Sequence, residues 1–532
     1  MLRRLTFMVK GLYHFVMNNL KQREIFILIL CLFIGFALRF YTFDQKSLWM
    51  DEVYTFNDSR DDLKGQIKFY KQNPTFLHPP LFFILTHQFY PFTKPERDLR
   101  IIPLIFGTLS ILMIYLLARQ FSPHIALPCT LSLTFMAYHI SLSQDARSYS
   151  LLLFLSMSGL YFFMKHLQTS KKEYLILVAF FFSTLFYTSY SSIPFIALSQ
   201  ILWFYRPNEE NKKPVLSSFL TLNGLIFLFC LPWIIFLISN YKGQPIVEEL
   251  RYTKDTISIW STAYWILHDW APYAPLMLFS IILIILFPFL SKNRKNVIVL
   301  LSILLLPIGG LYLFCSLLNL SHFITSRYFI SFLPIFFISI YLSLNTIEIR
   351  FKIFKRFLRL NLLFVILFIL SNLILLPLYY RSEKQDFRGL VNYLKAEIHD
   401  GDKIILASEI YFPGMLHYFG VYPYGRHYSI PYRRISDTEI EYNTPLIIEN
   451  KKFIISYSKK YWLQYALEEN RLWFVVNKIT AKKEKDNPSC VLKGYFDGSF
   501  LNLNRFPMDA SMYLILRDPQ SPQEKGIDLP IE

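Results

Sequence analysis

Residues 101–119 read IIPLIFGTLSILMIYLLAR, an apolar run whose first charge is Arg119 at its end. The hydrocarbon core of a bilayer is about 30 Å thick and is crossed by about 20 helical residues, so this run is long enough to span it. The whole chain of 532 residues has the same character, being 53% hydrophobic and only 17% charged. A soluble chain of this length would need more charge to cover its surface. The sequence therefore predicts a polytopic α-helical membrane protein.

Further apolar runs lie on both sides of this segment. We predict about eleven transmembrane helices, at 25–43, 101–119, 122–141, 147–165, 173–190, 192–205, 216–238, 273–290, 297–318, 327–345 and 360–379. The segment 79–91 is too short to span the membrane, begins with a proline pair and ends at Pro91, so we interpret it as an interfacial helix. A true span there would invert everything that follows it.

Basic residues are concentrated in the connections on one predicted side of the membrane. With the N-terminus inside, these connections include Arg119 and the segment IEIRFKIFKRFLR at 347–359. Cytoplasmic loops carry such an excess of Lys and Arg. Topology thereby accounts for the net charge of +17, and no basic patch lies in a domain of a nucleic-acid-binding type, so we expect no nucleic-acid partner. The first outer loop then covers about residues 44–100.

The last 153 residues of the chain, 380–532, have a different pattern. Strand-like runs alternate with turns and charges after an amphipathic helix at 386–398. These runs are DKIILAS (402–408), KFIISYS (452–458), RLWFVVN (471–477) and SMYLILRD (511–518). We therefore divide the chain into a membrane domain, residues 1–379, and a soluble α/β domain, residues 380–532, on the outer side.

The first outer loop begins with SLWMDEVYTF, residues 47–56, which places Asp51 and Glu52 directly after the first span. A partly desolvated carboxylate near the membrane surface is suited to taking a proton from an acceptor hydroxyl or amine as that group attacks a sugar carbon. The alternative is that Asp51 caps the free amides of a following helix.

Two more groups of polar residues fall on the same predicted side. His78 precedes Pro79 and Pro80 and could donate a hydrogen bond to a phosphate or sugar, or be a solvated interfacial histidine. Asp145 and Arg147 lie in a very short outer connection, where ionised side chains are costly and are functional candidates. An ordinary Asp–Arg pair that fixes the helix boundary is the alternative.

The segment Ser326-Arg327-Tyr328-Phe329 begins the tenth span at its outer face. Arg327 is a cation against the topological trend, and an anionic lipid phosphate would explain its position. Snorkelling to membrane phosphates is the alternative. His268 and Asp269 occupy another outer segment. Together these residues offer a base, an anion clamp and an aromatic-lined surface for an isoprenoid tail.

The sequence resembles the GT-C superfamily of lipid-dependent glycosyltransferases, in the bacterial branch related to protein O-mannosyltransferases and the lipid A aminoarabinose transferase. The resemblance covers roughly residues 24–345 in order and spacing. It rests on LWMDEVYT, HPPLFFIL, RIIPLIFGTLSILMIYLLARQ, QDARSYSLL and SRYFISFLPIFF. The segment DFRGLVNYLKAEIHDGDKIILAS is similar to the start of the external domain in many such bacterial proteins.

This resemblance implies an inverting transfer of a sugar from a polyprenyl phosphate to an envelope acceptor, which is lipid A or lipopolysaccharide, another glycan or a protein. It places the protein in the bacterial cytoplasmic membrane, among membrane lipids, with the active site and C-terminal domain facing the periplasm or exterior. It implies Asp51 as the general base, supported by Glu52. Around the donor it implies His78, Asp145, Arg147, Arg327 and Tyr328. The lipid-linked sugar is a substrate, so no cofactor is expected. The sequence contains no compact carboxylate-rich cluster of the kind that binds a divalent metal ion, so we expect no metal site.

Two other functions compete with this one. Many helices with buried charges also suit a transporter or flippase for a lipid-linked glycan, although the informative charges cluster on one side. A non-catalytic scaffold could hold other envelope enzymes through the C-terminal domain, in which no catalytic motif is evident.

Overall fold

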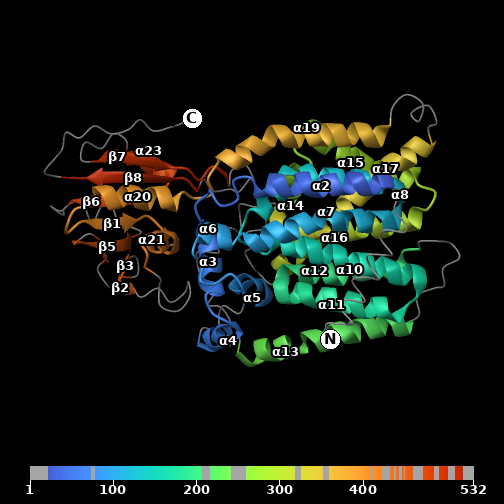
Figure 1. Cartoon of the computed structure of the whole chain (residues 1–532), viewed down its shortest axis with the longest axis horizontal. Helices are drawn as coiled ribbons and strands as arrows, with labels where there is room; N and C mark the ends of the chain where they lie inside the picture. The colour runs from blue at the N-terminus through green and yellow to red at the C-terminus, as the bar shows by residue number, and fades with distance from the viewer. Residues whose placement is uncertain are drawn as a thin grey trace.

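The computed structural model describes residues 22–72, 78–206, 216–240, 259–317, 325–350, 359–408, 411–421, 432–436, 439–442, 446–448, 450–458, 471–484, 490–500 and 510–518. A bundle of apolar helices forms one region of the molecule and a mixed β-sheet with short helices forms the other (Figure 1). The short helices of the first outer loop lie where the two regions meet.

Each predicted transmembrane run falls on a helix or on a helix with a break. The helices are α2 (Gln22–Phe40), α7 (Ile101–Phe121), α8 (Pro123–Phe135), α9 (Ala137–Ser143), α10 (Tyr149–Thr169), α11 (Lys172–Thr188), η1 (Tyr190–Ser192), α12 (Ile193–Ser199), η2 (Gln200–Phe204), α13 (Leu216–Asn240), α14 (Ile259–Trp270), α15 (Ala274–Leu290), α16 (Arg294–Leu317), η4 (Ser326–Phe332), α17 (Leu333–Arg350) and α19 (Leu360–Arg381). Among the described residues, 5 helices are long and apolar enough to cross a membrane, or up to 7 if each bent pair counts as one span. The number eleven therefore stays a prediction.

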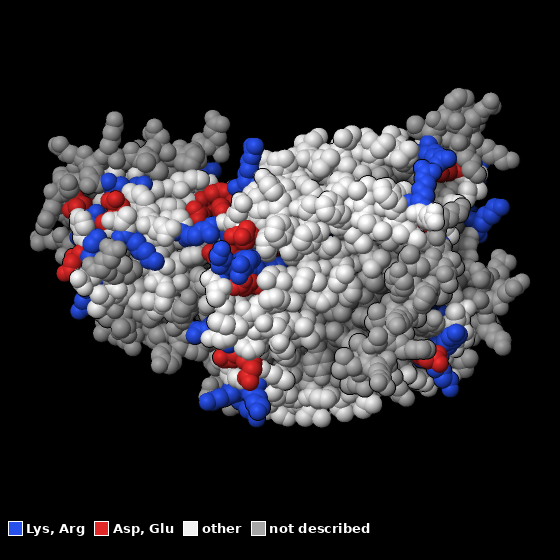
Figure 2. Space-filling view, viewed as in Figure 1, with Lys and Arg blue, Asp and Glu red and all other residues white. Residues whose placement is uncertain are grey.

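The ends of the helices show which segments share a side. Arg119 at the end of α7 contacts Glu24 at the start of α2 at 3.3 Å, so these two helices run antiparallel. On the face drawn in Figure 2, charged side chains gather at the two ends of the helical region and on the sheet region, and the described residues seen in the band between them carry no charge. This distribution suits a bundle whose middle lies in hydrocarbon.

A buried arginine stabilises the bend of 61° between α8 and α9. Arg39 donates from its guanidinium to the carbonyl oxygens of Leu133 (2.9 Å) and Thr134 (3.2 Å), which lie in the last turn of α8. It also lies 2.8 Å from Nδ1 of His139 on α9. A broken helix leaves backbone groups unpaired, which is costly in an apolar environment. Arg39 therefore sets the position of α9 and of the connection that follows it.

The described part of the first outer loop, residues 44–72 and 78–100, contains four short helices: α3 (Met50–Ser59), α4 (Leu63–Gln72), α5 (Leu81–His87) and α6 (Pro95–Asp98). The predicted interfacial helix is α5, which begins directly after Pro80 because proline suits the start of a helix.

The C-terminal region contains α20 (Phe387–Glu397), α21 (Phe412–Tyr418), α23 (Lys478–Glu484) and strands β1 (Lys403–Leu406), β2 (Tyr432–Ser436), β3 (Glu439–Tyr442), β4 (Leu446–Ile448), β5 (Lys451–Ser458), β6 (Leu472–Val476), β7 (Val491–Phe496) and β8 (Met512–Arg517). The sheet has the order β2-β3-β5-β1-β6-β8-β7, and β4 pairs with β5. The pairs β5–β1 and β1–β6 are parallel and the others are antiparallel. The four strand-like runs of the sequence are confirmed as β1, β5, β6 and β8.

The C-terminal region holds the backbone that leads into α3. The Tyr418 hydroxyl lies 2.7 Å from the amide nitrogen of Leu48 and accepts its proton. The amide of Met50 donates to Oε1 of Gln385 at 3.0 Å. Because these partners come from beyond α19, the sheet region and the first outer loop form one continuous support for the start of α3.

Candidate functional site

Asp51 and Glu52 occupy the first turn of α3, where successive side chains point about 100° apart around the helix axis. Trp49 is the N-cap residue of this helix, so the interpretation of Asp51 as the cap is wrong. The side chain of Asp51 is 18% exposed, whereas that of Glu52 is fully buried. The two neighbouring carboxylates therefore face different surroundings.

Asp51 lies between two arginines that come from distant segments of the chain. Its Oδ2 is 3.6 Å from Nη1 of Arg327 and 4.0 Å from Nε of Arg147. Arg147 also donates to the backbone oxygen of Asp51 and to the Thr55 hydroxyl, at 3.3 and 3.4 Å. One carboxylate beside two guanidinium groups leaves a net positive charge, which favours an anionic ligand.

Glu52 forms a closed ion pair with Arg100. The Arg100 guanidinium donates from Nε to Oε1 at 2.8 Å and from Nη2 to Oε2 at 2.7 Å, and the amide of Ala146 donates to Oε1 at 2.8 Å. Burial raises the pKa of Glu52, but the nearby Arg100 and Lys384 outweigh it and lower this pKa to about 2. Glu52 therefore joins the first outer loop to the connection after α9 and does not reach the pocket.

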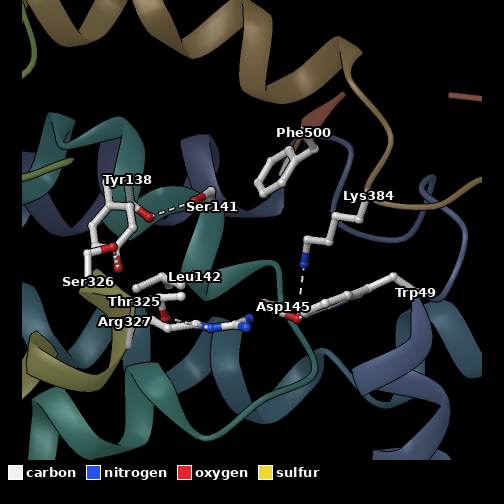
Figure 3. A pocket seen from close by; sticks show the side chains of 10 residues that line it. All are labelled: Trp49, Tyr138, Ser141, Leu142, Asp145, Thr325, Ser326, Arg327, Lys384 and Phe500. Carbon is white, nitrogen blue, oxygen red and sulfur yellow. Dashed lines mark hydrogen bonds and ion pairs between the residues drawn. The ribbon is translucent and has the colours of Figure 1, made fainter. Parts of the chain in front are cut away.

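A pocket opens next to Asp51 and Glu52, and Asp145 lies in its wall (Figure 3). Asp145 Oδ1 accepts a hydrogen bond from Trp49 Nε1 at 3.1 Å and forms an ion pair with Lys384 Nζ at 3.0 Å. The lining residues are Trp49, Tyr138, Ser141, Leu142, Asp145, Thr325, Ser326, Arg327, Lys384 and Phe500. They come from the start of α3, from α9, from η4 and from the C-terminal region.

Aromatic rings fix the direction of Arg327. Its guanidinium carbon lies 5.3 Å from the ring centre of Trp49, 5.7 Å from that of Tyr149 and 6.0 Å from that of Tyr328. Arginine over an aromatic face is held by cation–π attraction. Tyr328 is 40% exposed and lies at the edge of the site, while Tyr149 is buried.

A chain of hydroxyl groups connects the pocket to Asp269 on α14. The Ser326 hydroxyl donates to Asp269 Oδ2, so it accepts from the Tyr138 hydroxyl at 3.0 Å. Asp269 is therefore one hydrogen bond away from the pocket wall.

His78 lies just before α5, outside the membrane-spanning helices. Its ring meets that of Phe83 edge to face, with 6.2 Å between the ring centres. Burial and the neighbouring Arg147 lower the pKa of His78 to about 4, although Asp51 acts in the opposite direction. At neutral pH this residue is thus an uncharged imidazole beside the two charged groups.

The structure brings together most of the residues that the sequence singled out, since Asp51, Arg147 and Arg327 are in contact and Asp145 lies in the adjoining wall. Sequence reasoning missed Arg100 and Lys384. Both are cations at predicted outer ends of spans, the signal that identified Arg327, so the same argument could have found them. Within the described ranges, no group of three or more His, Cys, Asp or Glu side chains could hold a metal ion. The role of each residue stays a prediction.

Residues 77–236 match the family model described as dolichyl-phosphate-mannose-protein mannosyltransferase. No curated protein sequence matches the chain significantly. The fold is similar to ArnT from Cupriavidus metallidurans in the apo state, with a TM-score of 0.51 and 10% identity over 92% of this chain and 97% of that one. The same protein bound to undecaprenyl phosphate gives a TM-score of 0.50 and 10% identity over 94% and 99%. The family match and the shared fold confirm the resemblance of this chain to the GT-C superfamily of membrane glycosyltransferases.

Proposed function

We propose that the protein is a glycosyltransferase that moves a sugar from a polyprenyl phosphate to an acceptor in the cell envelope. The observation that carries this proposal is the position of Asp51 between Arg147 and Arg327 at the edge of a pocket. The undecaprenyl phosphate bound by the structurally similar ArnT supports a donor of this class. We place the reaction at the outer face of the bacterial cytoplasmic membrane, without a metal ion or cofactor.

The chemistry follows from the charges of these three side chains. A hydroxyl or amine of the acceptor attacks the anomeric carbon of the sugar, and Asp51 takes the proton that the attacking group loses. The bond between the anomeric carbon and the phosphate oxygen breaks, and the electron pair leaves with the polyprenyl phosphate. Attack from the side opposite the leaving group inverts the anomeric configuration.

The two arginines suit the leaving group. The donor phosphodiester carries about one negative charge, whereas a phosphate monoester carries about 1.5 to 2 at neutral pH. Negative charge therefore grows on the phosphate during the reaction, and Arg147 and Arg327 stabilise it. Their contacts with Asp51 at 4.0 and 3.6 Å are longer than the 2.7–2.9 Å that is usual for charged hydrogen bonds. A bound phosphate can thus recruit both arginines and leave Asp51 a stronger base.

The acceptor of the sugar can be identified from the products of the reaction in the cell envelope. Mass spectrometry of envelope glycolipids, glycans and glycoproteins, from cells with and without the gene, identifies the product by the mass of a missing sugar. A lipid A, glycan or protein acceptor each gives a separate signal. The proposal predicts the loss of one glycosylated product and the accumulation of its lipid-linked donor.

The test of the site uses Asp51→Asn in purified full-length protein with that donor and acceptor. General bases contribute about 10²- to 10⁴-fold to rate, so kcat should fall by this factor while undecaprenyl phosphate still binds. Asp44→Asn is the matched control, because Asp44 is an exposed aspartate in the same loop. A folded Asp51→Asn protein with full activity would exclude Asp51 as the base.

A transporter would place ionisable groups along a path through the membrane. Helix α3, which carries Asp51, lies instead at the end of the bundle next to the sheet region (Figure 1). Movement of labelled lipid-linked sugar across vesicles without covalent transfer would favour a transporter over the enzyme that we propose.

A further inference from the structure

We infer that the pocket beside Asp51 binds the sugar of the donor, and that Lys384 and Phe500 form a wall of this sugar subsite from the C-terminal region. The inference rests on the proposed function and deepens it. It assigns the phosphate to Arg147 and Arg327, and the hydroxyl groups of the sugar to the oxygen atoms of Asp145, Ser141 and Tyr138.

The polar wall of the pocket is formed by Asp145, Ser141 and Tyr138, and it consists mainly of oxygen atoms that can accept hydrogen bonds. Asp145 uses Oδ1 for both Trp49 and Lys384, so its Oδ2 remains an acceptor for a bound group. The Ser141 hydroxyl donates its proton to the backbone oxygen of Tyr138 at 2.7 Å, which leaves its oxygen as an acceptor.

The Tyr138 hydroxyl has the same property, because its proton is used on Ser326. Carboxylate and hydroxyl oxygens whose protons are already committed repel a phosphate but accept hydrogen bonds from sugar hydroxyls. The oxygen atoms of Asp145, Ser141 and Tyr138 therefore favour the hydroxyl groups of the sugar, and the phosphate lies at the edge of the pocket, at Arg327 and Arg147.

Two aromatic rings complete the pocket. Trp49 lies between two cations, with the Lys384 ammonium 5.6 Å and the Arg327 guanidinium 5.3 Å from its ring centre. Figure 3 shows Phe500 and Lys384 entering the pocket from the side opposite Ser326 and Arg327. Ligand pockets typically combine apolar and aromatic walls with a few convergent polar groups, and the C–H face of a sugar ring fits such a wall.

The C-terminal region holds Phe500 firmly in this position. The amide of Phe500 donates to the backbone oxygen of Glu383 at 3.0 Å, and the amide of Glu383 donates to Oδ2 of Asp497 at 2.7 Å. The Phe500 ring packs edge to face on Tyr379 at the end of α19, with 5.2 Å between ring centres. A substitution of Phe500 therefore alters the pocket, although Phe500 is far from Asp51 in the sequence.

Binding measurements on the purified full-length protein test this assignment without catalysis. The probes are undecaprenyl phosphate and undecaprenyl phosphate carrying glucose, galactose, mannose, N-acetylglucosamine or arabinose. We expect wild type to bind one glycosylated lipid more tightly than undecaprenyl phosphate. Ser141→Ala and Phe500→Ala should each reduce that preference by about threefold to tenfold, the size of one lost hydrogen bond or contact. Their affinity for undecaprenyl phosphate should stay within about twofold of wild type.

Phe500→Leu keeps an apolar side chain and serves if Phe500→Ala does not fold. Ile479→Ala is the matched control, because Ile479 is an exposed apolar residue of the same C-terminal region. The inference is overturned if no sugar raises affinity above that of undecaprenyl phosphate, or if the Ser141 and Phe500 variants keep the full preference. Failure of the proposed function is a different result: wild type would bind no undecaprenyl phosphate, or cells without the gene would lose no glycosylated envelope product.

Discussion

The surroundings of Asp51 and Glu52 differ more than the adjacency of these two residues in the sequence would suggest. Glu52 is fully buried and accepts two hydrogen bonds from the Arg100 guanidinium, at 2.7 and 2.8 Å. Asp51 is 18% exposed, and its two arginines stand at 3.6 and 4.0 Å. The short, closed network has no capacity for a ligand, whereas the longer, shared contacts around Asp51 can be exchanged for one. Contact geometry separates a structural carboxylate from a reactive one.

Arg100 explains why the Glu52 network is closed. Besides Glu52, its guanidinium donates to the backbone oxygens of Phe43 (2.9 Å), Lys46 (3.1 Å) and Ser47 (3.1 Å). The pair therefore fixes the turn that leads into α3, and it positions Asp51 without touching the pocket.

The largest effect on stability is expected from breaking this closed pair. Glu52→Gln or Arg100→Met leaves one buried charge without its partner, which costs about 3–5 kcal/mol. Thermal unfolding of the purified protein should show a large loss of stability for both variants, whereas Asp51→Asn should unfold like wild type. Equal unfolding temperatures for Glu52→Gln and Asp51→Asn would remove the distinction between the two carboxylates.

The contacts of Asp51 with Arg147 and Arg327 form an open network. Loss of an arginine from this network should lower the rate of the reaction rather than the stability of the fold. Removing one preorganised donor to developing negative charge costs about 10²- to 10³-fold in kcat, which we expect for Arg327→Met. Arg327→Lys keeps the charge but not the planar fork, so it should recover only a fraction of the rate. Steady-state kinetics of both variants measure kcat and KM, and thermal unfolding serves as the control for folding. A change in KM alone would assign Arg327 to ground-state binding.

Lys384 contacts both the closed network, through Glu52, and the pocket wall, through Asp145, and so gives an intermediate case. Its ammonium is 3.0 Å from Asp145 and 4.0 Å from Glu52. Lys384→Met should destabilise the protein because it leaves Asp145 charged and buried. Adding Asp145→Asn should recover some of the loss, with a coupling of about 0.5–3 kcal/mol in a double-mutant cycle of unfolding free energies. Additive effects would show that the two residues act independently.

The smallest expected effect concerns His78. Because its pKa in the folded protein is about 4, below the usual value near 6.5, the unfolded chain binds more protons between these two pH values. Its contribution to stability is therefore present above about pH 6.5 and is lost as the pH falls toward 4. His78→Gln should flatten that range of the stability profile and leave the shape of the kcat/KM profile between pH 6.5 and 8 unchanged. A change in that profile would instead give His78 a titrating role in the reaction.

Much of the architecture could be predicted because it depends on local sequence. The apolar runs all coincide with helices, the proline pair begins α5, and four alternating runs are strands of the sheet. The division of polar residues by side of the membrane could also be predicted, since topology follows from the charges of the connections. On that basis Asp51, Asp145, Arg147 and Arg327 are expected to share one face without any knowledge of their contacts.

The sequence by itself thus determined the class of fold, the grouping of the polar motifs on one side and the residue types available for chemistry. Only the tertiary structure decided that Glu52 is paired with Arg100, that Lys384 holds Asp145, and that Phe500 closes the pocket from the C-terminal region. The physical reason is that charge and apolarity along a chain specify which side of a membrane a residue occupies. Which partners it meets there depends on helix rotation, the bend at α8–α9 and the docking of a distant sheet, none of which is local.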